Sequence, residues 1–163
     1  MSTRQLDILV ADDHRLTRDI VGEILLAIDC TRVRYVEDGA SAVSEIMAAA
    51  PDIAIVDYDM PFDGLSVLEF VRRSTASLDD ALPIIVMTSL TARKRVLALR
   101  DAGANEILTK PFTARTILSR IAAVIDTPRP FIRTPNFVGP DRRRNQSIGY
   151  TGPLRREADG LWL

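Results

Sequence analysis

The stretch "DIAIVDYDMPFDG", residues 52–64, decides the fold class of this chain. Its apolar residues 53–56 are typical of a buried strand, and three carboxylates follow within seven positions. The first of them, Asp57, stands where the apolar run stops, and a charge at a buried edge is costly unless a neighbouring group compensates for it. The stretch therefore predicts an inner strand that ends in an acid whose charge is compensated by a neighbouring group.

Four further short apolar runs predict the other strands of the same sheet. Residues 6–11 and 83–88 are nearly continuous in apolar character, as expected of strands that are covered on both faces. Residues 32–37 alternate between apolar and polar, and residues 105–109 are short and partly polar, so these two runs indicate edge strands.

Segments with helical spacing separate the five strands. The fourth predicted helix is capped by Thr91 and ends at Gly103, and the fifth begins at Thr113. Strict alternation of strands and helices predicts an α/β fold with a doubly wound five-stranded parallel sheet in the order 2-1-3-4-5. The first helix is marked by Leu16, Ile20, Ile24 and Ile28, which repeat every fourth residue, and Val21 and Leu25 widen this apolar stripe.

The length of 163 residues suits one domain with an appendage. No apolar run is long enough to span a membrane, and the N-terminal residues do not have the pattern of a signal peptide. The single cysteine, Cys30, fits a reducing compartment, and the single histidine, His14, argues against a zinc site of cysteine and histidine. We therefore expect a cytoplasmic protein.

Charge and composition divide the chain near residue 126. Residues 127–163 hold seven arginines and three acids, a net charge of +4, whereas the first 126 residues hold 14 basic and 19 acidic residues, a net charge of −5. The C-terminal part also contains five of the nine prolines and four of the eight glycines. We predict a domain over residues 5–126 and an irregular or disordered extension over residues 127–163.

Polar residues follow four of the predicted strands at their carboxyl ends. In an open parallel sheet these ends meet at one edge, and ligands bind where the strand order reverses. The residues that this topology brings together are Asp12, Asp13, Asp57, Thr88, Ser89 and Lys110.

These side chains suit the transfer of a phosphoryl group. Clustered carboxylates repel one another unless a cation neutralises them, and such hard oxygen ligands suit Mg²⁺. Lys110 supplies a second positive centre, and the Thr88 hydroxyl can donate to a phosphoryl oxygen. A carboxylate can itself accept the group as an aspartyl phosphate, and Asp57 is the predicted acceptor.

The motifs "ADD", "IVDYDMPFDG", "MTS" and "TKPF", each at a strand end, resemble those of the response-regulator receiver domain, the flavodoxin-like (βα)5 family of the bacterial chemotaxis regulator. The resemblance covers about residues 5–126. It implies a two-component signalling protein that accepts a phosphoryl group from a histidine kinase or phosphotransfer protein. It also implies a cis peptide bond between Lys110 and Pro111.

The resemblance assigns a role to each residue of the site. Asp12, Asp13 and Asp57 would hold Mg²⁺ together with the backbone carbonyl of Asp59. Asp57 would be phosphorylated, and the phosphoryl group would be bound by Thr88, Ser89 and Lys110. Many receivers have an aromatic ring three residues before the lysine, but this chain has Ile107 there, so a readout through an aromatic ring is not expected.

Output is expected through another protein that meets the surface of the fourth helix, fifth strand and fifth helix. We expect no enzymatic activity beyond self-catalysed phosphotransfer and dephosphorylation, no DNA-binding domain in this sequence, and a homodimer as one oligomeric form. Two alternatives stay open. One is a hydrolase of the phosphatase type with Asp59 as its acid–base group, and the other is a scaffold that binds independently of phosphate through the extension.

The extension contains the phrase "GPDRRRN", residues 139–145. Its three guanidiniums, on Arg142, Arg143 and Arg144, are a candidate anion site, because guanidinium groups bind phosphates in a bidentate manner. A cyclic dinucleotide, nucleic acid or anionic lipid would suit this chemistry. A solvated arginine run and a tail that docks on a protein are the other interpretations.

Overall fold

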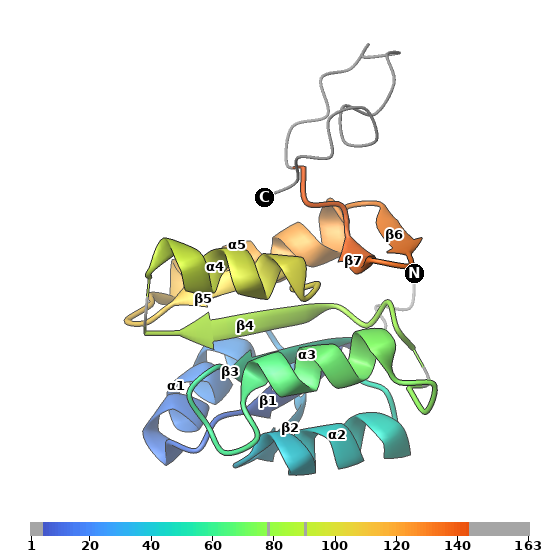
Figure 1. The fold of residues 1–163 in the computed structure, drawn as a ribbon. Helices are drawn as coiled ribbons and strands as arrows, with labels where there is room; N and C mark the ends of the chain where they lie inside the picture. Colours follow the sequence, from blue (N-terminus) through green and yellow to red (C-terminus); the bar gives the residue numbers. More distant parts are fainter. Residues whose placement is uncertain (1–4, 78, 90, 144–163) are drawn as a thin grey trace.

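The computed structural model describes residues 5–77, 79–89 and 91–143 (Figure 1). Its main body is a parallel sheet in the order β2-β1-β3-β4-β5, which confirms the predicted topology. Each strand is one residue shorter than its predicted range, which for the third strand is residues 52–57. The strands are β1 (Asp7–Ala11), β2 (Arg32–Val36), β3 (Ile53–Asp57), β4 (Ile84–Thr88) and β5 (Glu106–Thr109).

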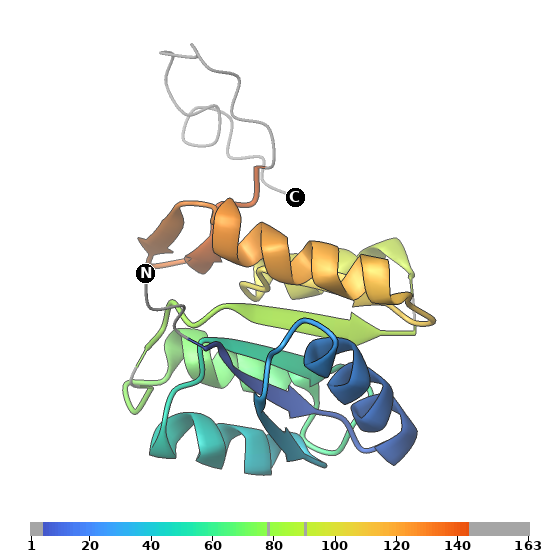
Figure 2. The same ribbon diagram turned by 180° about the vertical axis from the view of Figure 1, so that it is seen from behind.

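Five helices cover the two faces of this sheet. α1 and α5 lie on the face seen in Figure 2, and the other three helices contribute to the core on the opposite face. In the described part of the chain, no helix is both long and apolar enough to cross a membrane. The helices are α1 (Arg15–Leu26), α2 (Gly39–Ala48), α3 (Gly64–Arg73), α4 (Arg93–Asp101) and α5 (Ala114–Asp126).

The inner strands are buried on both faces because their successive side chains enter two different cores. In β1, Leu9 and Ala11 pack in the core beneath α2, α3 and α4, whereas Ile8 and Val10 pack in the core beneath α1 and α5. β3 and β4 are buried along their whole lengths in the same way. This explains why these strands are continuously apolar in the sequence.

The helix starts agree with the predicted caps in one place and differ in another. The Thr113 side chain caps α5, as predicted, and the Asp63 carboxylate caps α3. The prediction that Thr91 caps α4 is wrong, because the amide of Val96 closes the first turn on the carbonyl of Ala92. α4 therefore begins without a side-chain cap.

Only part of the stripe that marks α1 in the sequence is buried. Val21 and Leu25 are buried completely, whereas Leu16 is 71% exposed and both Ile20 and Ile28 are exposed as well. A strict four-residue repeat drifts around a helix that has 3.6 residues per turn, so such a stripe cannot stay on one face. The stripe correctly indicates a helix but only in part which side of it is buried.

The extension is the main difference from the predicted fold. Residues 131–140 form an antiparallel hairpin of β6 (Phe131–Thr134) and β7 (Phe137–Pro140), so the prediction of irregular structure from residue 127 onward is wrong for this part. At the turn, the Thr134 hydroxyl bonds with both the amide and the carbonyl of Phe137. Residues 144–163 lie outside the described residues.

The hairpin lies beside a buried arginine at the end of α3. The Arg72 guanidinium is 5.4 Å from the centre of the Phe131 ring, and burial lowers the pKa of Arg72 to about 10, so it stays charged at neutral pH. Arg133 of β6 pairs with Asp80 through two hydrogen bonds of 2.7 and 2.9 Å. The acceptors of Arg72 itself are the carbonyls of Asp80, Leu82 and Gly103 and Oδ1 of Asn105.

Substitution Arg72→Leu should destabilise the fold by about 3 kcal/mol, because it leaves buried acceptors without a donor. Urea unfolding followed by circular dichroism measures this loss. The control is Arg73→Leu, since Arg73 is the exposed neighbour on the same helix, and it should change stability little. Equal unfolding midpoints for the two variants would contradict the structural role of Arg72.

Candidate functional site

The polar residues predicted to meet at one sheet edge follow four parallel strands. Asp12 and Asp13 come after β1, Asp57 is the last residue of β3, Thr88 is the last residue of β4, and Lys110 follows β5. The register aligns β3 with both of its neighbours, β1 and β4, so the ends of these strands lie level.

Lys110 joins two of the acids. Its Nζ lies 2.7 Å from Oδ2 of Asp12 and 2.7 Å from Oδ1 of Asp57, and both carboxylates are buried. Burial by itself lowers the pKa of Lys110, but the hydrogen bonds and charges of the two carboxylates outweigh it and raise this pKa overall. The ammonium group is therefore firmly charged. The peptide bond from Lys110 to Pro111 is cis, as the resemblance implies.

Asp57 is 1% exposed, and its two oxygens have different surroundings. Oδ2 accepts a hydrogen bond of 3.2 Å from the amide of Asp59, whereas Oδ1 has only the ion pair with Lys110 and no well-formed hydrogen bond. Burial raises the pKa of Asp57, Lys110 lowers it in part, and the neighbouring charges of Asp12 and Asp59 raise it further. This carboxylate is thus costly to keep charged.

The start of α3 approaches the backbone of Asp57 closely. A Cβ atom at Gly64 would lie 2.7 Å from the carbonyl oxygen of Asp57, so the position requires glycine. This contact explains why the motif of residues 52–64 ends in glycine, and it fixes where α3 begins relative to the site.

Asp13 lies at the rim of the site and contacts a residue that the sequence analysis did not assign to it. Nδ1 of His14 lies 2.8 Å from Oδ1 of Asp13 and 3.5 Å from Oδ1 of Asp12. The three residues form the one group of clustered metal-ligand side chains among the described residues. His14 is the residue before α1, and its side chain is mostly exposed.

The remaining predicted site residues lie on β4, β5 and the chain after β4. Thr88 is completely buried, and its carbonyl accepts a hydrogen bond from the amide of Lys110. Ser89 is exposed. Ile107 of β5 is partly buried and packs against the core beneath α4, at the place where other receivers have an aromatic ring.

The side chain of Asp59 points to a partner that sequence reasoning missed. Its carboxylate lies 3.1 Å from Nη1 of Arg95 on α4, and the Arg95 guanidinium also lies 4.2 Å from the centre of the Tyr58 ring. The backbone of Asp59, through its amide, is what contacts Asp57. No pattern in the sequence predicts the ion pair of Asp59 and Arg95, because 36 residues separate them.

The donor set fits a divalent cation. Asp12, Asp13 and Asp57 carry three negative charges against the single positive charge of Lys110, which leaves a net charge of −2. The Oδ1 atom of Asp57 is a buried oxygen without a hydrogen bond, and carboxylate oxygens are the ligands that Mg²⁺ prefers. The residues present therefore fit the ion that the resemblance implies.

The predicted anion site in the extension is not an open cluster. Nη1 of Arg142 lies 2.7 Å from Oδ1 of Asp101 on α4, and its guanidinium lies 4.4 Å from the centre of the Phe137 ring. Arg143 is exposed and lies 3.9 Å from Asp141. Arg144 lies outside the described residues. Arg142 thus binds the domain itself rather than facing solvent as part of an arginine run.

The structure is thus a doubly wound parallel sheet with clustered acids and a lysine at its carboxyl edge, the edge at which such sheets bind ligands. The family described as response regulator receiver domain matches residues 8–122, and the chain belongs to it. Response regulator MprA of Mycobacterium avium is 35% identical over 124 residues, which are 76% of this chain and 52% of that protein. The chain thus spans about half the length of the curated relatives it matches.

Solved structures agree with this assignment. Chemotaxis protein CheY4 of Vibrio cholerae is 26% identical with a TM-score of 0.67, and the match covers 74% of this chain and 99% of that one. The receiver domain of sensor histidine kinase PA1611 from Pseudomonas aeruginosa is 28% identical with a TM-score of 0.63, over 72% of this chain and 94% of that one. The latter structure has a magnesium ion coordinated in its active-site cleft.

Substitution Asp57→Asn should stabilise the protein at neutral pH, by about 1 kcal/mol, because it removes a charge that burial disfavours. The raised pKa means that the folded state binds a proton more readily than the unfolded state. The advantage of the variant is therefore complete above the folded-state pKa of Asp57 and declines as the pH falls through that value. Thermal unfolding of both proteins between pH 7 and pH 4 measures it.

A stability advantage that grows as the pH falls would contradict the assignment of the raised pKa to Asp57. The matched control is Asp63→Asn, which changes an acid outside the site that caps α3. Loss of a capping charge should destabilise slightly, so the two substitutions are expected to have opposite signs.

Proposed function

We propose that this protein is a phosphorylation-dependent response regulator of a two-component system, with Asp57 as the phosphoryl acceptor. The observation that carries the proposal is the environment of Asp57, a buried carboxylate at a strand end that is held by Lys110 beside a second buried carboxylate, Asp12. A purely structural ion pair would not need the further acid Asp13 at the rim.

The reaction is an exchange of one bond to phosphorus for another. A carboxylate oxygen of Asp57 attacks the phosphorus of a phosphohistidine on a histidine kinase or phosphotransfer protein. The new bond to oxygen forms as the bond to the histidine nitrogen breaks, and the nitrogen keeps the electron pair and takes up a proton. Attack of water on the aspartyl phosphate later releases phosphate and restores Asp57.

The residues around Asp57 have distinct tasks in this transfer. Lys110 binds an oxygen of the transferred group, and the hydroxyl of Thr88, with Ser89 beside it, donates to another. The carboxylates of Asp12, Asp13 and Asp57 and the backbone carbonyl of Asp59 would hold Mg²⁺. When bound, this ion supplies neutralisation of the phosphoryl charge.

The output that we propose is a change in affinity for a protein target. The phosphoryl group shifts the population of two arrangements of the chain after β4 and of α4, and the target meets the surface of α4, β5 and α5. Because Ile107 replaces the aromatic ring, this readout depends on the position of the helix rather than on a ring that turns. A second copy of the chain is a candidate for the same surface.

The two alternatives are less well supported. In a hydrolase Asp59 would exchange protons with the substrate, but its carboxylate pairs with Arg95. A phosphate-independent scaffold that binds a cyclic dinucleotide or a partner through the extension would need accessible arginines, but Arg142 contacts Asp101 and Phe137. We therefore expect no catalytic activity beyond self-phosphorylation and dephosphorylation. A cytoplasmic location remains a prediction from the sequence.

Incubation with acetyl phosphate and Mg²⁺ should add one phosphoryl group to the wild-type protein, as measured by intact mass. Chelation of the metal should abolish the adduct, because the net negative site repels an anionic donor. Asp57→Asn should give no adduct. The control Asp52→Asn changes an acid at the opposite end of β3 and should leave the adduct in place.

An adduct that persists in Asp57→Asn would move the acceptor elsewhere and overturn the assignment. The absence of any adduct on folded wild-type protein that still binds Mg²⁺ would favour the scaffold. Steady release of phosphate from simple esters over many turnovers would favour the hydrolase.

A further inference from the structure

The "GPDR" stretch of the extension, residues 139–142, contacts the turn between α4 and β5 within the domain. The amide of Asp141 donates to the carbonyl of Pro130, and its carbonyl accepts from Arg129, which also donates to the carbonyl of Asn105 at the start of β5. The Arg129 side chain therefore links the two ends of the hairpin segment to the turn.

Two glycines make this close approach feasible. A Cβ atom at Gly139 would lie 2.7 Å from Cα of Gly103, and a Cβ atom at Gly103 would lie 2.6 Å from the carbonyl oxygen of Val138. Gly103 also has a φ of 99°, which favours glycine at the end of α4. The glycine in "GPDR" is thus a contact residue of the docked hairpin.

Arg142 extends the contact from the hairpin to α4. Its side chain is 15% exposed, lies against the Phe137 ring, and pairs with Asp101, the last residue of the helix. A guanidinium this far from solvent needs its carboxylate partner. The pair forms only while the hairpin is docked and α4 holds its present position.

α4 is held loosely between two such pairs. Leu99 is its one completely buried residue, and its first turn lacks a side-chain cap. At its beginning Arg95 pairs with Asp59, and at its end Asp101 pairs with Arg142. A short helix with little buried apolar surface is the kind of element that moves at low cost.

The pair of Arg95 and Asp59 is connected to the proposed phosphoryl acceptor, because the amide of Asp59 donates a hydrogen bond to Oδ2 of Asp57. A phosphoryl group on Asp57 adds negative charge beside Asp59 and competes with it for the Arg95 guanidinium. A change at this end of α4 displaces Asp101 at the other end, since a helix moves as a rigid rod.

We propose that residues 137–142 are an intramolecular ligand of the α4–β5 turn, and that phosphorylation of Asp57 weakens their docking through α4. The coupling rests on the phosphorylation proposed above. A hollow of about 350 Å³ lies between α4, β5 and the extension, and Arg129 and Arg142 are among its lining residues. The docked extension therefore forms part of the wall of this hollow. Undocking would remodel this hollow on the surface that we assign to the target.

Coupling of this kind is reciprocal. If phosphorylation weakens the docking by a given factor, then loss of the docking favours phosphorylation by the same factor. A variant that releases the hairpin should therefore reach a higher phosphorylated fraction at a limiting concentration of donor, although the substitution lies at the far end of α4.

Hydrogen–deuterium exchange of the full chain tests the coupling. With acetyl phosphate and Mg²⁺ in excess, amides of residues 131–141 should exchange about fivefold faster or more than in the unphosphorylated protein. Intact mass on the same samples reports the phosphoryl adduct. If the adduct forms and exchange in residues 131–141 does not change, the coupling is wrong while the proposed function stands.

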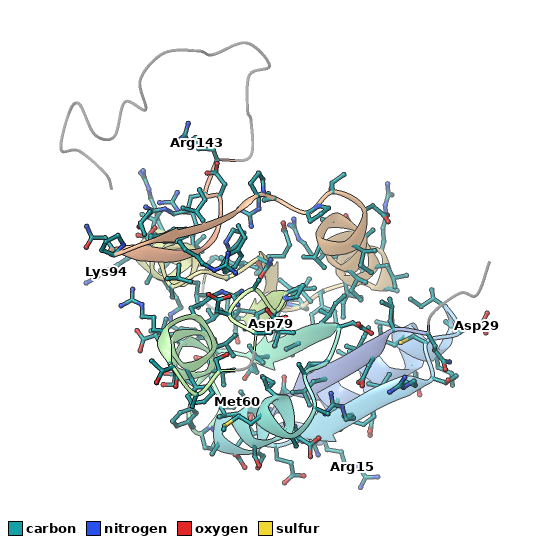
Figure 3. All side chains as sticks on the ribbon, turned by 90° about the vertical axis from the view of Figure 1, so that its right-hand side faces the viewer. Arg15, Asp29, Met60, Asp79, Lys94 and Arg143 are labelled. Carbon is teal, nitrogen blue, oxygen red and sulfur yellow. The ribbon has the colours of Figure 1, made fainter. Side chains whose placement is uncertain are left out.

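Substitutions at the two ends of α4 separate its two contacts. Arg95→Ala should still be phosphorylated but should lose the response of residues 131–141, whereas the control Lys94→Ala, an exposed neighbour on α4, should keep it (Figure 3). Arg142→Ala should show fast exchange without phosphorylation, whereas the control Arg143→Ala should not. A full response in Arg95→Ala would overturn the route through α4.

Reversal of the charges of Arg142 and Asp101 distinguishes loss of this ion pair from general unfolding of the domain. Arg142→Asp alone places two acids together and should release the hairpin, and a second substitution, Asp101→Arg, should restore slow exchange by re-forming the pair in the opposite sense. Failure of the double substitution, in a chain that keeps its circular dichroism spectrum, would show that Arg142 does not hold the hairpin through Asp101. No adduct on wild-type protein would remove both proposals together.

Discussion

The ammonium group of Lys110 between two buried carboxylates is the contact on which this domain depends. Asp12 and Asp57 end neighbouring strands, and without a cation between them their charges would push apart the carboxyl ends of β1 and β3. The positive charge of the lysine reduces the repulsion between the two carboxylates but does not neutralise the site, since Asp13 adds a further negative charge at the rim. Burial, and after it the charge of Asp12, disfavours the charged form of Asp57, and the excess of negative charge gives the site the capacity to bind a divalent cation.

Much of this could be predicted from the sequence because the decisive features are local or follow from topology. An apolar run marks each inner strand, and parallel strands bring whatever follows them to one edge, so Asp12, Asp57 and Lys110 could be placed together although up to 98 residues separate them. The buried face of α1 could be predicted only in part. Its apolar residues cover more of the helix than the domain buries, and only packing selects Val21 and Leu25.

The parts that could not be predicted depend on single long-range contacts without a periodic signal. The hairpin has strands of four residues, which is too short for an alternating pattern to stand out among prolines and glycines. Its docking depends on Arg72, an arginine that looks like any other at the end of a helix, and on a pair of glycines in contact. The Arg95–Asp59 pair could not be predicted from the sequence either, because a surface arginine has many acids within reach.

The two ends of the domain are stabilised by different means, and this difference bears on how a signal could travel. At the carboxyl edge, charges are concentrated and poorly matched, so one added phosphoryl group changes the balance strongly. At the opposite end, Arg72 has four matched acceptors and resists change. α4 contacts both regions but is anchored firmly in neither, since Leu99 is its one buried residue and its first turn lacks a side-chain cap. A helix held by weak, separable contacts between a sensitive site and a rigid base is the element most easily displaced by chemistry at Asp57.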